Sequence, residues 1–215
     1  MILSAERAKE VARHLLQIKA IKMQPDAPFR WASGWYAPIY CDNRISLSYP
    51  KVRNFLRERL AEGIQEKYPG AEAIAGVATG AIAISALVAQ QLNLPLVYVR
   101  PEPKKHGRQN QIEGHLEADQ KVVVIEDLIS TGGSSLKAVE ALRDHGARVQ
   151  GMAALFTYGF DQSVQRFAEA QCPLFTLSDY PHLLQVLRGE EQIDLGQEKL
   201  LTQWRQDPEN WKQNA

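Results

Sequence analysis

Two adjacent acids, followed at once by small, hydroxylated and glycine residues, form the part of this chain best suited to chemistry. Glu126 and Asp127 close an apolar, β-branched stretch (122–125) whose composition predicts a buried parallel strand. Residues 130–135, STGGSS, then lead into a segment, 136–146, with apolar residues at helical spacing. Such a loop surrounds an anion with backbone N–H groups and the positive end of a helix dipole. Carboxylates at the strand end can meet sugar hydroxyls or Mg²⁺, so the stretch suits a phosphorylated sugar.

Residues 100–114, RPEPKKHGRQNQIEG, form a second polar segment. It carries two prolines, two glycines and five basic residues, Arg100, Lys104, Lys105, His106 and Arg108. An isolated basic run is more often a solvated surface loop. This one directly follows an apolar strand (95–100) and ends just before the acidic strand, and long polar loops inside a compact domain are usually functional, often as lids. A cationic lid would neutralise an anionic leaving group such as pyrophosphate.

Length, composition and charge indicate an ordinary globular protein. The 215 residues suffice for one domain with a substantial core, and 45% are hydrophobic and 23% charged. Lys plus Arg and Asp plus Glu are both 25, which argues against a nucleic-acid binder. Two distant cysteines, Cys41 and Cys172, are neither a disulfide framework nor a zinc cluster. The charged N-terminus is not a secretory signal, and no apolar run reaches membrane-spanning length. We therefore expect a soluble, cytoplasmic protein.

Alternating elements must position these residues. Apolar spacing predicts a first helix over 5–20, a short strand pair within 29–44 and a long helix over 50–68. Strands and helices then alternate: strands at 73–78, 95–100, 121–127 and 149–156, and helices at 81–92 and 136–146. This alternation predicts an α/β fold with a parallel sheet covered on both faces and ligands at the carboxyl ends of its strands. No repeat or linker divides the chain, so we expect a single domain over 1–215. Its polar tail should pack through Trp204 and Trp211.

Segment 121–135 resembles the phosphoribosyl pyrophosphate (PRPP) signature of type I phosphoribosyltransferases. The resemblance implies that family's fold, a central, mainly parallel sheet flanked by helices with a small N-terminal hood mainly within 1–45. It also implies that the two acids bind the ribose hydroxyls and that the following loop wraps the 5′-phosphate. The PRPP-binding residues of this stretch would be Glu126, Asp127, Leu128, Ile129, Ser130, Thr131, Gly132, Gly133 and Ser134. The turn 76–80 resembles the family's pyrophosphate loop, which sometimes contains a non-proline cis peptide, and would add Thr79 and Gly80; a simple strand-to-helix turn is the alternative.

The basic segment resembles one group within this family. Its pattern of Arg100, Lys104, His-Gly (106–107) and Ile-Glu-Gly (112–114) is similar to the mobile catalytic loop, here about 101–114, of orotate phosphoribosyltransferases. By that resemblance PRPP and orotate are the substrates, and Mg²⁺ is bound mainly through PRPP and through Asp127 by way of water. The residues implied to be catalytic are Arg100, Lys104, His106 and Asp127, and Lys105 would also contact PRPP. In the family this loop closes over the neighbouring subunit's site, which implies a homodimer.

The sequence identifies the residues that contact the base less clearly than those that contact PRPP. Residues 29–44 resemble the hood over the pyrimidine, where the aromatic side chains either stack on the base or pack internally. Ser130, Arg44 and Tyr40 are the implied orotate contacts, although an internal ion pair is the favoured interpretation of Arg44. Many orotate enzymes have lysines where Ala32 and 80–81 fall, and an arginine where this chain reads LFTYGF (155–160). Two alternatives therefore stay open: a phosphoribosyltransferase for another nucleobase, and a PRPP-sensing regulator.

Overall fold

A six-stranded sheet forms the centre of the molecule. The computed structural model describes residues 2–31, 33–102 and 111–211, and within them the strands lie in the order β10-β9-β8-β5-β6-β7. Neighbouring strands are parallel except β7, which runs antiparallel to β6 at one edge. The strands are β5 (Ala73–Val77), β6 (Leu96–Val99), β7 (Ile112–Glu113), β8 (Lys121–Ile129), β9 (Arg148–Thr157) and β10 (Leu174–Asp179).

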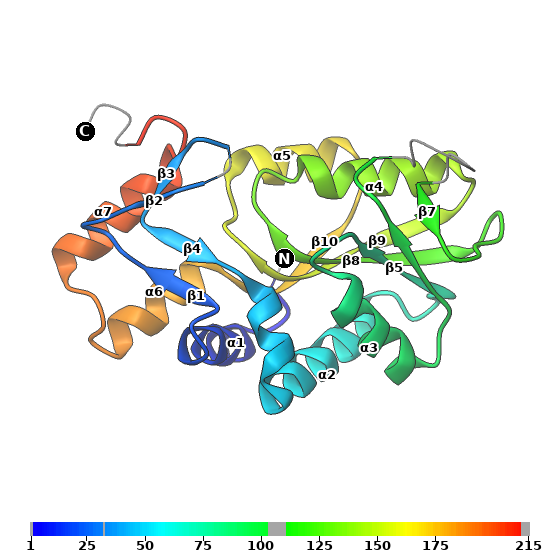
Figure 1. The fold of residues 1–215 in the computed structure, drawn as a ribbon, viewed down its shortest axis with the longest axis horizontal. Helices are drawn as coiled ribbons and strands as arrows, with labels where there is room; N and C mark the ends of the chain where they lie inside the picture. The colour runs from blue at the N-terminus through cyan, green and yellow to red at the C-terminus, as the bar shows by residue number, and fades with distance from the viewer. Residues whose placement is uncertain (1, 32, 103–110, 212–215) are drawn as a thin grey trace.

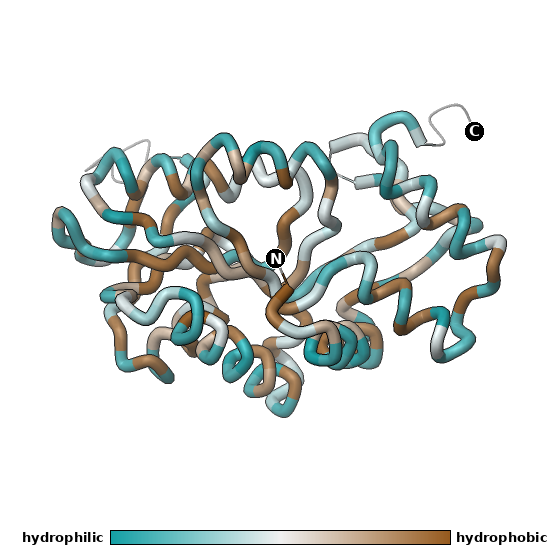
Figure 2. Tube along the Cα trace, turned by 180° about the vertical axis from the view of Figure 1, so that it is seen from behind, coloured by the Kyte–Doolittle hydropathy of each residue, from teal (hydrophilic) through white to brown (hydrophobic). Residues whose placement is uncertain are grey.

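Helices cover both faces of this sheet (Figure 1). One face carries α1 (Ala5–Gln17), α2 (Pro50–Lys67) and α3 (Ile82–Leu92), and the other carries α4 (Gly133–Asp144) and α5 (Asp161–Glu169). Because side chains alternate along a strand, Val122 and Val124 of β8 pack into one core and Val123 and Ile125 into the other. Figure 2 shows the resulting distribution, with hydrophobic strands between helices whose outer turns are hydrophilic. The apolar run of β8 therefore reflects burial on two sides.

A separate layer stands beside the carboxyl ends of the strands, and we call its strands and their connections, residues 21–41, the hood. β1 (Ile21–Met23) pairs with β4 (Ile39–Cys41), and β2 (Phe29–Arg30) pairs with β3 (Tyr36–Ala37), both antiparallel. A 3₁₀ turn, η1 (Asn43–Ser48), leads from the hood to α2. The last two helices, α6 (Tyr180–Gly189) and α7 (Leu195–Gln206), lie at the same end of the molecule as the hood (Figure 1).

The fully buried Trp204 joins α7 to the hood. Its indole N–H donates to the carbonyl of Tyr36 at 3.2 Å. Its ring meets that of Trp31 edge-on, with centroids 5.7 Å apart, and that of Phe160 at 5.5 Å. Such aromatic pairs add to the stabilisation that burial alone provides. The prediction that Trp204 anchors the tail is confirmed.

The predicted alternation of elements up to residue 156 is confirmed, with differences at element ends, whereas α5, β10 and α6, which follow it, were not predicted. The first helix ends at Gln17 rather than near residue 20, because the chain turns there into β1, a strand that the spacing did not predict. The third predicted strand continues past 127 to Ile129, since β9 remains paired with it to that point. The polar tail contains α7, which begins with a capping box in which Asp194 accepts from the N–H of Gln197 at 2.8 Å. None of the described helices is long and apolar enough to cross a membrane.

Candidate functional site

The two acids at the end of β8 have different surroundings. Glu126 is 5% exposed and accepts hydrogen bonds from the hydroxyl of Ser135 at 2.9 Å and from the backbone N–H of Asp127 at 3.0 Å. Burial, and next the charge of Asp127, raise the pKa of Glu126 well above its usual range. Asp127 is partly exposed. Glu126 thus holds the start of α4 against β8, and Asp127 is the acid open to a ligand.

The turn that follows β5 lies against Asp127. A Cβ atom at Gly80 would lie only 2.6 Å from the carboxyl carbon of Asp127, so the absence of a side chain there leaves room for the acid. The peptide between Ala78 and Thr79 is cis, as the resemblance to pyrophosphate loops had suggested, and Thr79 is exposed. The N–H of Ala78 donates to the carbonyl of Val99 at 2.8 Å, which places the turn beside the end of β6.

Two of the helices that begin at this edge of the sheet, α3 and α4, lack a side-chain cap. The N-cap positions of α3 and α4 are Ala81 and Gly132, and neither provides a capping side-chain hydrogen bond. Uncapped first-turn N–H groups and the positive end of a helix dipole favour a bound anion. Together with the acid of β8, they give this edge the groups that a phosphorylated sugar requires.

The loop between β8 and α4 packs closely on α5. Gly132 has a φ of +79°, and a Cβ atom there would lie 2.9 Å from Cε2 of Phe167. The side chain of Ile129 is fully buried, and its carbonyl accepts from the hydroxyl of Thr157 at 3.2 Å, so this residue anchors the loop to β9. The remaining predicted loop residues, Leu128, Ser130, Thr131, Gly133 and Ser134, are partly or fully exposed. Glycine at 132 is needed both for the turn and for the contact with α5.

Arg166 is a site residue that the sequence did not reveal. Its Nη1 donates to the carbonyl of Thr131 at 3.1 Å, across 35 positions of the chain. It also lines a cavity of about 510 Å³ between the loop and the hood, together with Trp31, Trp35, Ser130, Thr131, Ser33, Gln162 and Glu209. The only sequence signal is an arginine in the amphipathic segment after LFTYGF, and nothing local distinguishes it from the other surface arginines.

The basic segment is placed only at its ends. Arg100 follows β6, lies 3.4 Å from the carboxylate of Glu113 and donates its N–H to the carbonyl of Gln111 at 2.9 Å. β7 brings the far end of the segment back to β6, so both ends lie beside the turn 78–80. Three predicted residues, Lys104, Lys105 and His106, lie outside the described residues, as does Ala32 of the hood.

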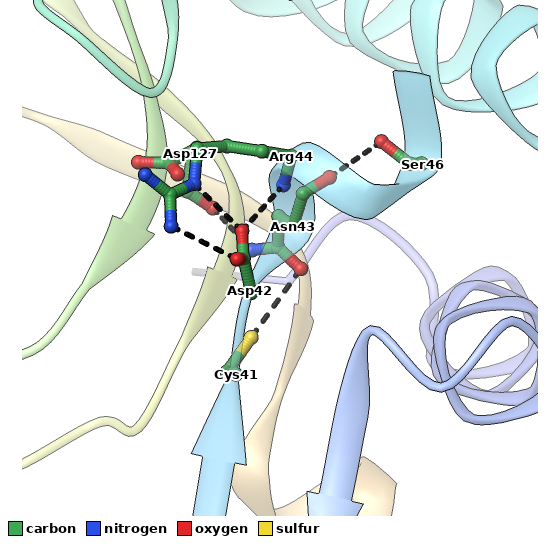
Figure 3. Close-up of polar contacts among 6 residues, drawn as sticks. All are labelled: Cys41, Asp42, Asn43, Arg44, Ser46 and Asp127. Atoms are coloured by element: carbon green, nitrogen blue, oxygen red, sulfur yellow. Dashed lines mark hydrogen bonds and ion pairs between the residues drawn. The ribbon is translucent and has the colours of Figure 1, made fainter. Parts of the chain in front are cut away.

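Residues in the hood and just after it divide between packing and exposure. The guanidinium of Arg44 pairs with both carboxylate oxygens of Asp42, at 2.7 and 2.9 Å (Figure 3), which confirms the favoured internal ion pair. Trp31 donates to the carbonyl of Ile39 at 3.1 Å and packs against Tyr158 with ring centroids 5.0 Å apart. Tyr40 is 41% exposed beside Phe29.

The aromatic stretch that stands where many orotate enzymes have an arginine is internal. Phe156, Tyr158 and Phe160 are at most 3% exposed. Tyr158 stacks on Phe160 with centroids 5.4 Å apart and meets Trp204 edge-on at 5.7 Å. This stretch therefore supports the hood and supplies no cation to the cavity.

Comparisons with known proteins agree with this geometry. The family model described as "Phosphoribosyl transferase domain" matches residues 44–179. An orotate phosphoribosyltransferase of Porphyromonas gingivalis is 54% identical over 94% of this chain and 97% of its own length. One of Cytophaga hutchinsonii is 50% identical, over 95% and 98% of the two chains. Among solved structures, the orotate phosphoribosyltransferase of Aeropyrum pernix has a TM-score of 0.74 and 28% identity, and covers 86% of this chain and 99% of its own.

Motif positions, sheet topology and near full-length similarity thus point to the same class of protein. This chain belongs to the phosphoribosyltransferase family and, within it, to the orotate phosphoribosyltransferases.

Proposed function

We propose that this protein transfers the phosphoribosyl group of PRPP to orotate, giving orotidine 5′-monophosphate and pyrophosphate in pyrimidine biosynthesis. The observation that carries the proposal is the meeting of Asp127, the uncapped start of α4 and the turn at Gly80 at one edge of the sheet. Relatives about half identical over nearly their whole length bear that enzyme's name.

The chemistry would be displacement at C1′ of ribose by a ring nitrogen of orotate. A transition state resembling an oxocarbenium ion needs positioning and charge stabilisation more than a protein nucleophile. Asp127 would hold the ribose hydroxyls, and the loop from Ser130 to Ser134 would donate backbone N–H groups to the 5′-phosphate. Arg100, with Lys104, Lys105 and His106, would surround the departing pyrophosphate.

The residues present fit Mg²⁺ that is bound mainly through the substrate. Mg²⁺ in such sites is usually held by one or two carboxylates, substrate phosphates and waters. Within the described ranges no group of three or more His, Cys, Asp or Glu residues could hold a metal by itself. Asp127 is the accessible carboxylate and would hold the ion by way of water. When bound, Mg²⁺ would neutralise charge on the diphosphate and so ease its departure.

On the base side, Ser130 is the residue we assign to orotate, since it lines the cavity between the loop and the hood. Tyr40 is exposed on the hood, whereas Arg44 is already paired with Asp42. We further propose a cytoplasmic homodimer in which the basic segment of one subunit reaches the site of the other.

A substrate panel tests the proposed function. The protein, Mg²⁺ and PRPP are mixed with orotate, uracil or adenine in turn, and loss of base absorbance is followed. We expect turnover with orotate and at least about a hundredfold lower kcat/KM with the others, since a site whose polar groups match one base discriminates strongly against bases that leave those groups unpaired. Turnover with adenine or uracil instead would assign a different nucleobase. PRPP binding without turnover of any base, together with a gel shift of DNA at physiological salt, would assign a regulator.

Arg166→Ala should weaken PRPP binding. The change removes the charged donor to Thr131 and should raise the KM for PRPP about tenfold, or about 1.4 kcal/mol, close to the value of a hydrogen bond from a charged group. Steady-state kinetics with varied PRPP measure the effect. Arg143→Ala is a matched control, because Arg143 also donates to backbone carbonyls, those of Ala170 and Gln171, but away from the loop. Equal KM values for the two variants would contradict a specific role for Arg166.

A further inference from the structure

A buried amide just after the hood contacts both Cys41 of the hood and the ligand-binding acid. Asn43, the first residue of η1, is 1% exposed, and its Nδ2 donates to the backbone carbonyl of Asp127 at 2.6 Å. The two residues are 84 positions apart in the chain. Figure 3 shows the side chain of Asn43 between the end of β4 and the end of β8.

Neighbouring groups fix which way this amide points. The thiol of Cys41 donates to Oδ1 of Asn43 at 3.3 Å, so Nδ2 is the end that faces Asp127. Burial, and next the charge of Asp127, raise the pKa of the Cys41 thiol well above its usual range, which keeps the S–H available as a donor. The hydroxyl of Ser46 donates to the backbone carbonyl of Asn43 at 2.6 Å, and this bond closes the turn without touching Asp127.

The backbone of Asp127 is consequently held on both sides of its Cα atom. Its N–H donates to Glu126 at 3.0 Å, and its C=O accepts from Asn43. Both bonds together fix the direction of the Cα–Cβ bond, while Gly80 lies against the carboxylate. A rigid supporting group keeps a binding carboxylate in its productive geometry, and small displacements are costly.

We propose that Asn43 is a positioning residue for Asp127, and that the strength of PRPP binding depends on its amide although it does not touch the ligand. The inference rests on the proposed function, because it takes Asp127 to bind the ribose of PRPP. It adds a route by which the hood influences the sugar half of the site. Cys41 belongs to the same arrangement as the donor that orients the amide.

Direct binding measurements on the full-length protein test the proposal. Calorimetry with PRPP and Mg²⁺ in the absence of base gives the dissociation constant, and steady-state kinetics give the KM for orotate. Asn43→Ala should raise the PRPP dissociation constant about tenfold, as expected for loss of one hydrogen bond at a binding group, and change the KM for orotate less than about twofold. Ser46→Ala is the matched control, which should lower Tm by a few degrees, roughly 2–6 °C, with PRPP affinity unchanged.

A second pair of variants covers the case in which Asn43→Ala does not fold. Cys41→Ala leaves Asn43 in place but removes the donor to its Oδ1, and should raise the PRPP dissociation constant about threefold, a fraction of the Asn43 effect because the contact with Asp127 remains. Cys41→Ser restores a donor and should return the affinity to that of the wild type.

Unchanged PRPP affinity in Asn43→Ala would overturn the proposal. Where that variant is unfolded, unchanged affinity in Cys41→Ala would do so instead. An equal loss of PRPP affinity in Ser46→Ala would also overturn it. A wild-type protein that binds PRPP but does not convert orotate would contradict the proposed function and leave this inference standing.

Discussion

Asp127→Asn should raise the KM for PRPP about a hundredfold while the folded state and the KM for orotate change little. Asparagine keeps the size of the side chain but loses the charge and one acceptor oxygen, and two hydrogen bonds to a charged group are worth roughly 2.7 kcal/mol or more. The neighbouring Glu126 is buried and accepts a hydrogen bond from Ser135, so it cannot replace the lost acid. Initial rates at varied PRPP and orotate separate the two KM values.

Asp119→Asn is the control for this change. Asp119 lies just before the opposite end of β8 and pairs with Arg148 on the surface, and exposed pairs contribute little to stability. We expect wild-type kinetics from it. An Asp127→Asn enzyme with an unaltered KM for PRPP would remove Asp127 from the ribose site.

Lys104→Ala should reduce kcat by about two to three orders of magnitude and change PRPP affinity much less. The reason is that a cation on a closing loop acts on the charge that develops on the leaving group, an interaction made mainly in the transition state. Its neighbour Arg100 and the strand β7 fix the two ends of the segment beside the turn at Gly80. Single-turnover rates together with PRPP binding distinguish this result from a simple loss of affinity, which would contradict the mechanism. Lys67→Ala, at the exposed end of α2, is the matched control.

Mixing these two impaired variants, assayed at a PRPP concentration near the wild-type KM where each alone has little activity, tests the shared site. If the basic segment of one subunit serves the other, a mixed dimer of Lys104→Ala and Asp127→Asn contains one intact site. Random reassociation then gives about a quarter of wild-type activity, since half the dimers are mixed and each has one of two sites. No recovery after mixing, with exchange of subunits verified by mass, would place Lys104 and Asp127 in the same subunit's site.

The sequence predicted the parts of the site that local residues determine. Asp127 and the loop from Ser130 follow directly from an apolar strand and a glycine turn, and their chemistry is contained in one short segment. The parallel sheet was implied by alternation, because parallel strands need long crossover connections that are usually helices, whereas the order of the strands in it was not predicted. The boundaries were less accurate where pairing with a neighbour, as at Ile129, extends a strand beyond its own apolar run.

Residues that act across the fold could not be predicted in the same way. Asn43 and Arg166 contact the acid strand and its loop from 84 and 35 positions away, and neither lies in a segment whose composition indicates a ligand. The contribution of α7 to the hood was also missed, although Trp204 was expected to pack. Its partner across 168 positions, the carbonyl of Tyr36, is a backbone group with no sequence signature.

Because Trp204 packs against the hood, the hood can reach its final packing only after α7 has been translated. The hood strands are translated well before the helix that packs against them, since Trp204 follows its hood partner Tyr36 by 168 positions. During synthesis the aromatic rings of Trp31 and Tyr158 therefore lack one of their packing partners until residue 204 has left the ribosome. Translation of α7 is therefore the step that completes the packing of the hood.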